Sequence, residues 1–275
     1  MADSWWLSVF YVVFLMLSAW VTERGTLAGI QSKRPLAADR LRLVTVSGLL
    51  VVMVSAVMTL VLAHGDRDRL TTLNLLLTAG GVFLTAFLVL PAAQISTRVV
   101  VSLACTIVGT LVGWFVPGSL VEMIVMAVSL LWVGLAVTKI LRLPLGGHLV
   151  LLTMMMLMDI YNIWLTPSTG SASDKTSQLP QLHYDGIFAF GDYSLGIGDF
   201  FIGAWAVGVL VIFRHQRLAF IGAAMIGMFR FFYRFWPGLE TVTIPYTIVI
   251  VPTAALLLAW SKKSFGSTPN QVFSR

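Results

Sequence analysis

Long apolar runs separated by short polar segments recur along the whole chain of 275 residues. A helix needs about 20 residues to cross the hydrocarbon core of a bilayer. Runs of about that length lie at roughly residues 5–22, 43–63, 70–91, 97–116, 119–138, 146–166, 186–212, 218–235 and 240–260. Lipid accepts only helices or closed barrels, and these runs are too long and too uniformly apolar for barrel strands. They predict an all-α, polytopic membrane protein with nine transmembrane helices.

The composition excludes a water-soluble domain. Charged residues make up 11% of the chain, whereas a soluble domain carries about 25%. The net charge of +6 does not indicate a nucleic-acid partner, because the basic residues form short patches between apolar runs. We expect a single integral membrane domain over 1–275, surrounded by the lipid bilayer. Its first five helices cover about 5–138, and its last four cover about 146–260.

The basic residues also predict an orientation. Nine helices put the two termini on opposite sides, and the side with the N-terminus carries five Lys and Arg residues against thirteen on the other. Cytoplasmic loops carry the excess of positive charge. We therefore expect an exocytoplasmic N-terminus and a cytoplasmic C-terminus, in the cell membrane of a prokaryote. The sequence does not predict the oligomeric state.

Two aspartates, Asp159 and Asp199, lie inside apolar runs, in the sixth and seventh predicted helices. Intramembrane acids are costly and usually face a cavity or a functional site. Both lie nearer the outer ends of these antiparallel helices, which can bring the carboxyls together at one depth. Glu122 and Glu240 fall near predicted helix starts, where an acid suits the helix dipole, so structural roles suffice for them.

Two neighbouring carboxyl groups share one proton, because both cannot ionise cheaply. One carboxylate then takes a proton from water while the other donates a proton to an amide oxygen. This is the chemistry of an aspartic protease, with Asp159 and Asp199 as the catalytic residues. It needs no metal and no cofactor, and the lone Cys105 and the scattered histidines offer no metal-ligand spacing.

Two glycines stand one residue apart directly before Asp199, in Gly196-Ile197-Gly198. Glycines are unfavourable within a helix. They allow an unwound start to the helix, where an extended peptide can pair with the backbone. Close packing against another membrane helix is the alternative role for them.

These motifs resemble the presenilin and signal peptide peptidase family of GxGD intramembrane aspartyl proteases. The family combines an acid in the sixth helix, Gly-x-Gly-Asp in the seventh and a proline-opened ninth helix. The resemblance implies a bundle of that type acting on transmembrane peptides or proteins. It implies that substrate is bound by two segments, namely Gly196, Ile197 and Gly198, and Pro245, Tyr246 and Thr247.

The chain departs from the family pattern at two places. Met158 precedes Asp159 where the family has tyrosine, and Tyr161 and Asn162 follow as supporting residues. Asn162 shares a helix face with Asp159 and can supply a hydrogen bond. At the start of the ninth helix, the residues after the proline replace the family's alanine and leucine with tyrosine and threonine.

The orientation favours signal peptide peptidases within this family, since their N-terminus lies outside, whereas that of presenilins lies inside. The resemblance then implies substrates whose own N-terminus is cytoplasmic, such as leftover signal peptides or type II membrane segments. A prepilin-type peptidase also carries Gly-x-Gly-Asp, but it acts at the cytoplasmic face, whereas both aspartates lie toward the outside. Two alternatives stay open: a proton-coupled transporter or channel, and an inactive relative that binds helices without cutting them.

The orientation can be tested with reporters at the C-terminus. A fluorescent protein that folds only in the cytoplasm should fluoresce when fused there, and a phosphatase active only outside should stay inactive. The opposite pattern would reverse the predicted orientation.

Overall fold

The computed structural model describes most of the predicted helical segments. The described residues are 2–27, 67–90, 95–116, 119–140, 143–161, 187–190, 193–213, 216–233 and 246–264. The predicted second helix, at about 43–63, lies outside them.

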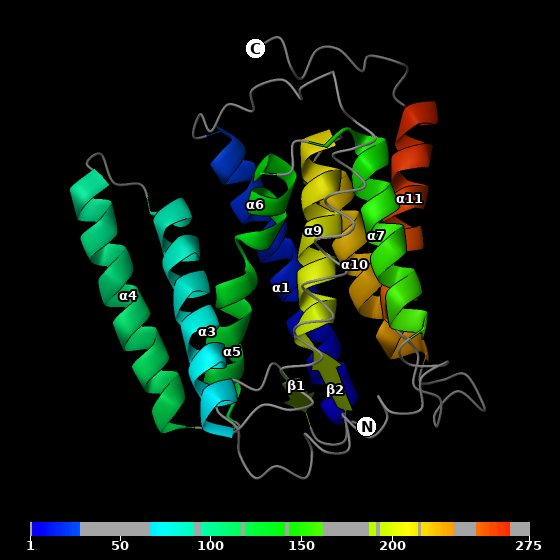
Figure 1. Cartoon of the computed structure of the whole chain (residues 1–275). Helices are drawn as coiled ribbons and strands as arrows, with labels where there is room; N and C mark the ends of the chain where they lie inside the picture. Colours follow the sequence, from blue (N-terminus) through cyan, green and yellow to red (C-terminus); the bar gives the residue numbers. More distant parts are fainter. Residues whose placement is uncertain are drawn as a thin grey trace.

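The described residues form a helical bundle with one short β-hairpin (Figure 1). The helices are α1 (Ala2–Leu27), α3 (Arg67–Val89), α4 (Ile95–Phe115), α5 (Leu120–Leu130), α6 (Val133–Ile140), α7 (Leu145–Ile160), α9 (Ile197–Phe213), α10 (Gln216–Tyr233) and α11 (Thr247–Ser264). The strands are β1 (Ile187–Phe190) and β2 (Tyr193–Gly196). Helices α5 and α6 together fill the fifth predicted segment, and each of the other helices falls in a predicted segment of its own.

Within the described ranges, three helical segments are long and apolar enough to cross a membrane, namely Trp5–Arg24, Ser96–Phe115 and Leu120–Thr138. Helix α4 is the most peripheral of them and exposes large apolar side chains along its length, including Ile107 at 56% and Phe115 at 77%. Such continuous apolar surface is typical of a helix in contact with lipid rather than with water. The chain is therefore a helical integral membrane protein that crosses the bilayer more than once.

The prediction of a seventh helix at about 186–212 is wrong at residues 187–190 and 193–196, which form strands. Ile187 pairs with Gly196 and Phe190 pairs with Tyr193 in an antiparallel hairpin, and α9 begins only at Ile197. Aromatic residues favour strands, and the glycines disfavour a helix. The non-helical backbone that those glycines predicted ahead of Asp199 is present as strand β2.

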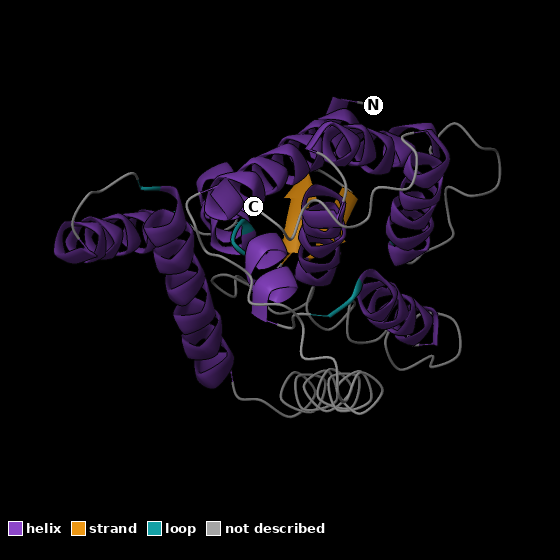
Figure 2. Ribbon diagram, turned by 90° about the horizontal axis from the view of Figure 1, so that it is seen from above, coloured by secondary structure: helices purple, strands orange, loops and turns teal. Residues whose placement is uncertain are grey.

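Helix α9 lies at the centre of the bundle and contacts α1, α6, α7, α10 and α11 (Figures 1 and 2). Its residues from Ile202 to Leu210 are all buried. A helix that is apolar on every side is expected to be surrounded by protein or lipid. Here the neighbouring helices surround it, which fixes the position of its first turn.

Glycines let α6 and α9 cross at close range. A methyl group added at Gly134 would meet the backbone oxygen of Ala204, and one added at Gly208 would meet the backbone of Gly134. Small residues allow such close approach of helix backbones in membranes. This crossing is one of the contacts that hold α9 in place.

Helix α7 ends, and α1, α9 and α11 begin, at the same end of the bundle (Figure 1). The basic residues Arg24, Lys139, Lys262 and Lys263 stand at the other ends of their helices. Arg67 and Arg69 lie in the first turn of α3, at the end where α1 begins (Figure 1), and the orientation stays a prediction from the charge count.

Two adjacent glycines of α3 offer a matched test of the packing. A methyl group at Gly81 would collide with the backbone carbonyl of Ser129 on α5, whereas one at Gly80 meets nothing within 4 Å. We expect Gly81→Ala to lower the free energy of unfolding by roughly 1–3 kcal/mol. Gly80→Ala should be neutral or slightly stabilising, because glycine is unfavourable within helices. Thermal unfolding in detergent compares the two, and equal stabilities would contradict this packing of α3 on α5.

Candidate active site

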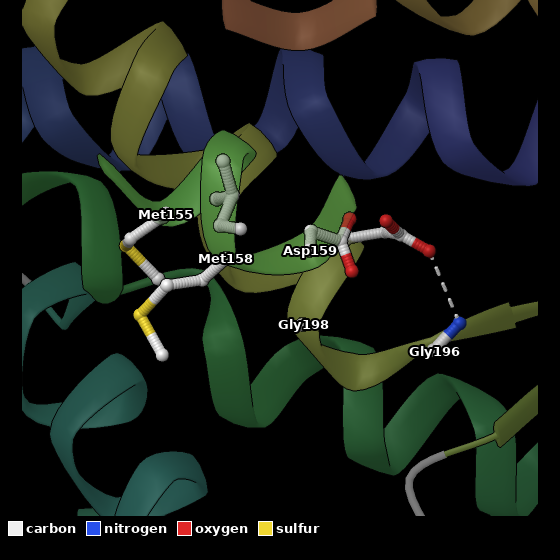
Figure 3. Close-up of a pocket in the computed structure, with 7 residues that line it drawn as sticks. Met155, Met158, Asp159, Gly196 and Gly198 are labelled. Atoms are coloured by element: carbon white, nitrogen blue, oxygen red, sulfur yellow. Dashed lines mark hydrogen bonds between the residues drawn. The ribbon is translucent and has the colours of Figure 1, made fainter. Parts of the chain in front are cut away.

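Asp159 and Asp199, 40 residues apart in the sequence, line one pocket of about 310 Å³. Asp159 comes from the last turn of α7, and Asp199 comes from the first turn of α9. The pocket is lined by Met155, Met158, Asp159, Gly196, Gly198, Asp199 and Ile202 (Figure 3). The fold thus brings together the two acids and both glycines of the predicted motif.

The carboxyl of Asp159 is bound by a residue of α11. The Thr247 hydroxyl donates a hydrogen bond to Asp159 Oδ2 at 2.7 Å. Thr247 is 1% exposed, and Asp159 is partly buried. A neutral donor therefore reaches this acid from a helix distant in the sequence.

The carboxyl of Asp199 faces back toward the strand that precedes it. The Gly196 backbone N–H donates a hydrogen bond to Asp199 Oδ2 at 3.3 Å (Figure 3). Asp199 also stands in the first turn of α9, where the partial positive charge of the helix N-terminus favours an anion. Asp159 stands in the last described turn of α7, is partly buried, and is bound by a neutral hydroxyl. The two acids therefore occupy electrostatically unlike places.

Helix α1 holds the first turn of α9. The Tyr11 hydroxyl donates a hydrogen bond to the backbone oxygen of Asp199 at 2.7 Å, and the Tyr11 ring meets Phe200 edge-on at 4.8 Å. Gly203 makes room for this contact, because a methyl group there would collide with the Tyr11 hydroxyl. Sequence reasoning missed Tyr11, whose only signal is a phenol within an apolar run, where a buried hydroxyl requires a partner.

Several residues of the predicted substrate-binding segments lie beside the pocket rather than in its lining. Ile197 opens α9 and is 43% exposed. Tyr246 is buried and donates a hydrogen bond to the backbone oxygen of Ile226 on α10. Thr247 reaches the site through Asp159. Pro245 lies outside the described residues.

The two predicted supporting residues, Tyr161 and Asn162, follow directly after α7 in the sequence. Tyr161 follows the last residue of α7 and is 56% exposed. Asn162 lies outside the described residues. A hydrogen bond to Asp159 comes from Thr247, which the sequence predicted as a substrate-binding residue.

The pocket combines two carboxyls, exposed glycine backbone and an apolar wall of Met155, Met158 and Ile202. Paired carboxyls can take and give a proton in the same reaction. The apolar wall suits a hydrophobic side chain, and methionine adapts its shape to what it contacts. In the described part of the chain, no group of three or more His, Cys, Asp or Glu residues could hold a metal.

No protein-family model, curated protein or solved structure matches this chain. The resemblance to GxGD proteases therefore stays a prediction from the sequence motifs.

The contact between α1 and α9 can be tested by a double-mutant cycle. Tyr11→Phe should lower the free energy of unfolding by about 1 kcal/mol, the typical value of one hydrogen bond. Gly203→Ala displaces the same hydroxyl, so Tyr11→Phe should have a smaller effect in that background. Thermal unfolding in detergent measures all four proteins, and strictly additive effects would contradict the contact.

Proposed function

We propose that this chain is an intramembrane aspartyl protease that hydrolyses peptide bonds of transmembrane helices with Asp159, Asp199 and water. One observation carries the proposal: two acids from separate helices of an apolar bundle line a single pocket. Intramembrane acids facing a cavity indicate function, and a pair of them supplies both the acid and the base that peptide hydrolysis requires.

The surroundings of the two acids favour different roles. Asp199 stands in the first turn of α9 and accepts a hydrogen bond from the Gly196 N–H, which favours its ionised form, so it is the general base. Asp159, partly buried between α7 and α11, is the general acid. Asp199 takes a proton from water while the water oxygen attacks the peptide carbonyl carbon. Asp159 gives its proton to the carbonyl oxygen. The tetrahedral intermediate then collapses and the C–N bond breaks. The amine leaves with the proton held by Asp199, and one hydroxyl of the intermediate returns a proton to Asp159.

The hairpin gives the substrate backbone a place to bind. Strand β2 ends at Gly196, whose N–H contacts Asp199. In the described part of the chain, β1 pairs with one edge of β2. An unwound substrate segment adds to the other edge as a further strand, through backbone hydrogen bonds. Its side chains then alternate between the pocket and the opposite face.

From the resemblance, we further propose nine transmembrane helices in a presenilin or signal peptide peptidase-like bundle. From the charge pattern, we propose an exocytoplasmic N-terminus, in a prokaryotic cell membrane. With both acids near the end at which α1 begins (Figure 1), cleavage takes place in the outer half of the bilayer. The substrates are then signal peptides or type II membrane segments.

The test compares wild type, Asp159→Ala and Asp199→Ala on a type II transmembrane substrate in liposomes, with products identified by mass spectrometry. Each exchange should lower the cleavage rate by at least about 10²–10⁴-fold, because it removes a general acid or base. Asp68→Ala, which also removes an acid from the first turn of a helix, here α3, is the matched control and should cleave normally. Product formation unaffected by either active-site exchange would refute the proposal.

A further inference from the structure

Thr247, the first residue of α11, uses its side-chain hydroxyl to bind Asp159, one of the two acids. Thr247 Oγ1 donates to Asp159 Oδ2 at 2.7 Å, across 88 residues of sequence. A threonine near a helix end commonly bonds to backbone within its own turn. Here the hydroxyl reaches another helix from a position that is 1% exposed. In such a place, water does not compete for the bond.

Contacts from two other helices fix the place where α11 begins. Tyr246, directly before Thr247, donates a hydrogen bond to the backbone oxygen of Ile226 on α10. Its ring meets that of Tyr11 on α1 edge-on, with 5.5 Å between the centroids. The Thr247 hydroxyl therefore reaches Asp159 from a backbone whose preceding residue, Tyr246, is held by contacts to α10 and α1.

The bond leaves the two oxygens of the Asp159 carboxyl unequal. Oδ2 is bound by Thr247, and the same side chain lines the pocket. With Oδ2 restrained, the carboxyl cannot turn freely about its last bond, so Oδ1 is left to exchange a proton with the substrate. A rigid catalytic group reacts faster than one that must first be oriented.

We propose that Thr247 is a positioning residue, whose hydroxyl orients the Asp159 carboxyl so that Oδ1 faces the scissile carbonyl. This inference rests on the proposed protease function. The contact between Thr247 and Asp159 involves both places where the chain departs from the family it resembles. Met158 lacks the hydroxyl of the tyrosine that usually precedes the first acid, and Thr247 brings a hydroxyl to a position that usually holds leucine. Both departures meet at one carboxyl.

Three variants test the inference on a transmembrane peptide substrate in liposomes. Thr247→Val keeps the shape of the side chain and removes the donor, and Thr247→Ser keeps the donor. Thr253→Val makes the same exchange further along α11 and is the matched control. Thr247→Val should lower kcat by about 10- to 100-fold with little change in KM. Thr247→Ser and Thr253→Val should stay within about threefold of wild type.

A second readout does not depend on cleavage. Thr247→Val should lower the unfolding temperature of the wild type and have little further effect in an Asp159→Ala background, where the acceptor is already absent. Equal decreases in both backgrounds would overturn the inference, as would a Thr247→Val enzyme that cleaves like wild type or a Thr247→Ser enzyme that is as slow as Thr247→Val. A wild-type protein that cleaves no transmembrane substrate would instead overturn the proposed function, and this inference with it.

Discussion

Carboxyl groups inside a bundle surrounded by lipid need hydrogen-bond donors, because neither lipid nor apolar side chains can replace the water that they lose. In this protein the donors come from separate elements. Thr247 of α11 serves Asp159, and the last residue of β2, Gly196, serves Asp199. The requirement for donors thus ties α7, α9, α11 and the hairpin together at one end of the bundle.

The position of Asp199 depends on two further constraints. Helix α9 is buried along most of its length and crosses α6 where Gly134 and Gly208 bring the backbones close together. Tyr11 then bonds to the backbone oxygen of Asp199 itself. Packing thus places the axis of α9, and this bond holds its first turn. The packing of α9 and the Tyr11 hydrogen bond together hold Asp199 where its carboxyl lines the same pocket as Asp159 of α7.

Hydropathy predicted the described helices and singled out Asp159 and Asp199, because an apolar run and a charge within it are both local features of the sequence. A charge within an apolar run stands out whatever the tertiary structure, and the double glycine before Asp199 predicted the break in the helix. The strands at Ile187–Phe190 and Tyr193–Gly196 were missed, because their apolar and aromatic residues read equally well as part of a membrane helix.

The hydroxyl contacts of the site could not be predicted from the sequence. Threonine and tyrosine are ordinary residues in membrane helices, and nothing local indicates that Thr247 reaches Asp159 or that Tyr11 reaches Asp199. Those partners lie 88 and 188 residues apart, so only the packing of the helices decides them. The sequence predicted a local donor to Asp159, Asn162, which lies outside the described residues. The structure points to a donor from α11.

We propose that Asp159 and Asp199 act as one dyad. The distance between their carboxyl oxygens in an experimental structure of the protein in lipid nanodiscs tests this directly. We expect carboxyls in near contact or bridged by a single water, because a shared proton requires charges within about 4–6 Å of each other. Carboxyls held more than about 8 Å apart, beyond that range, with substrate bound between other residues, would contradict it.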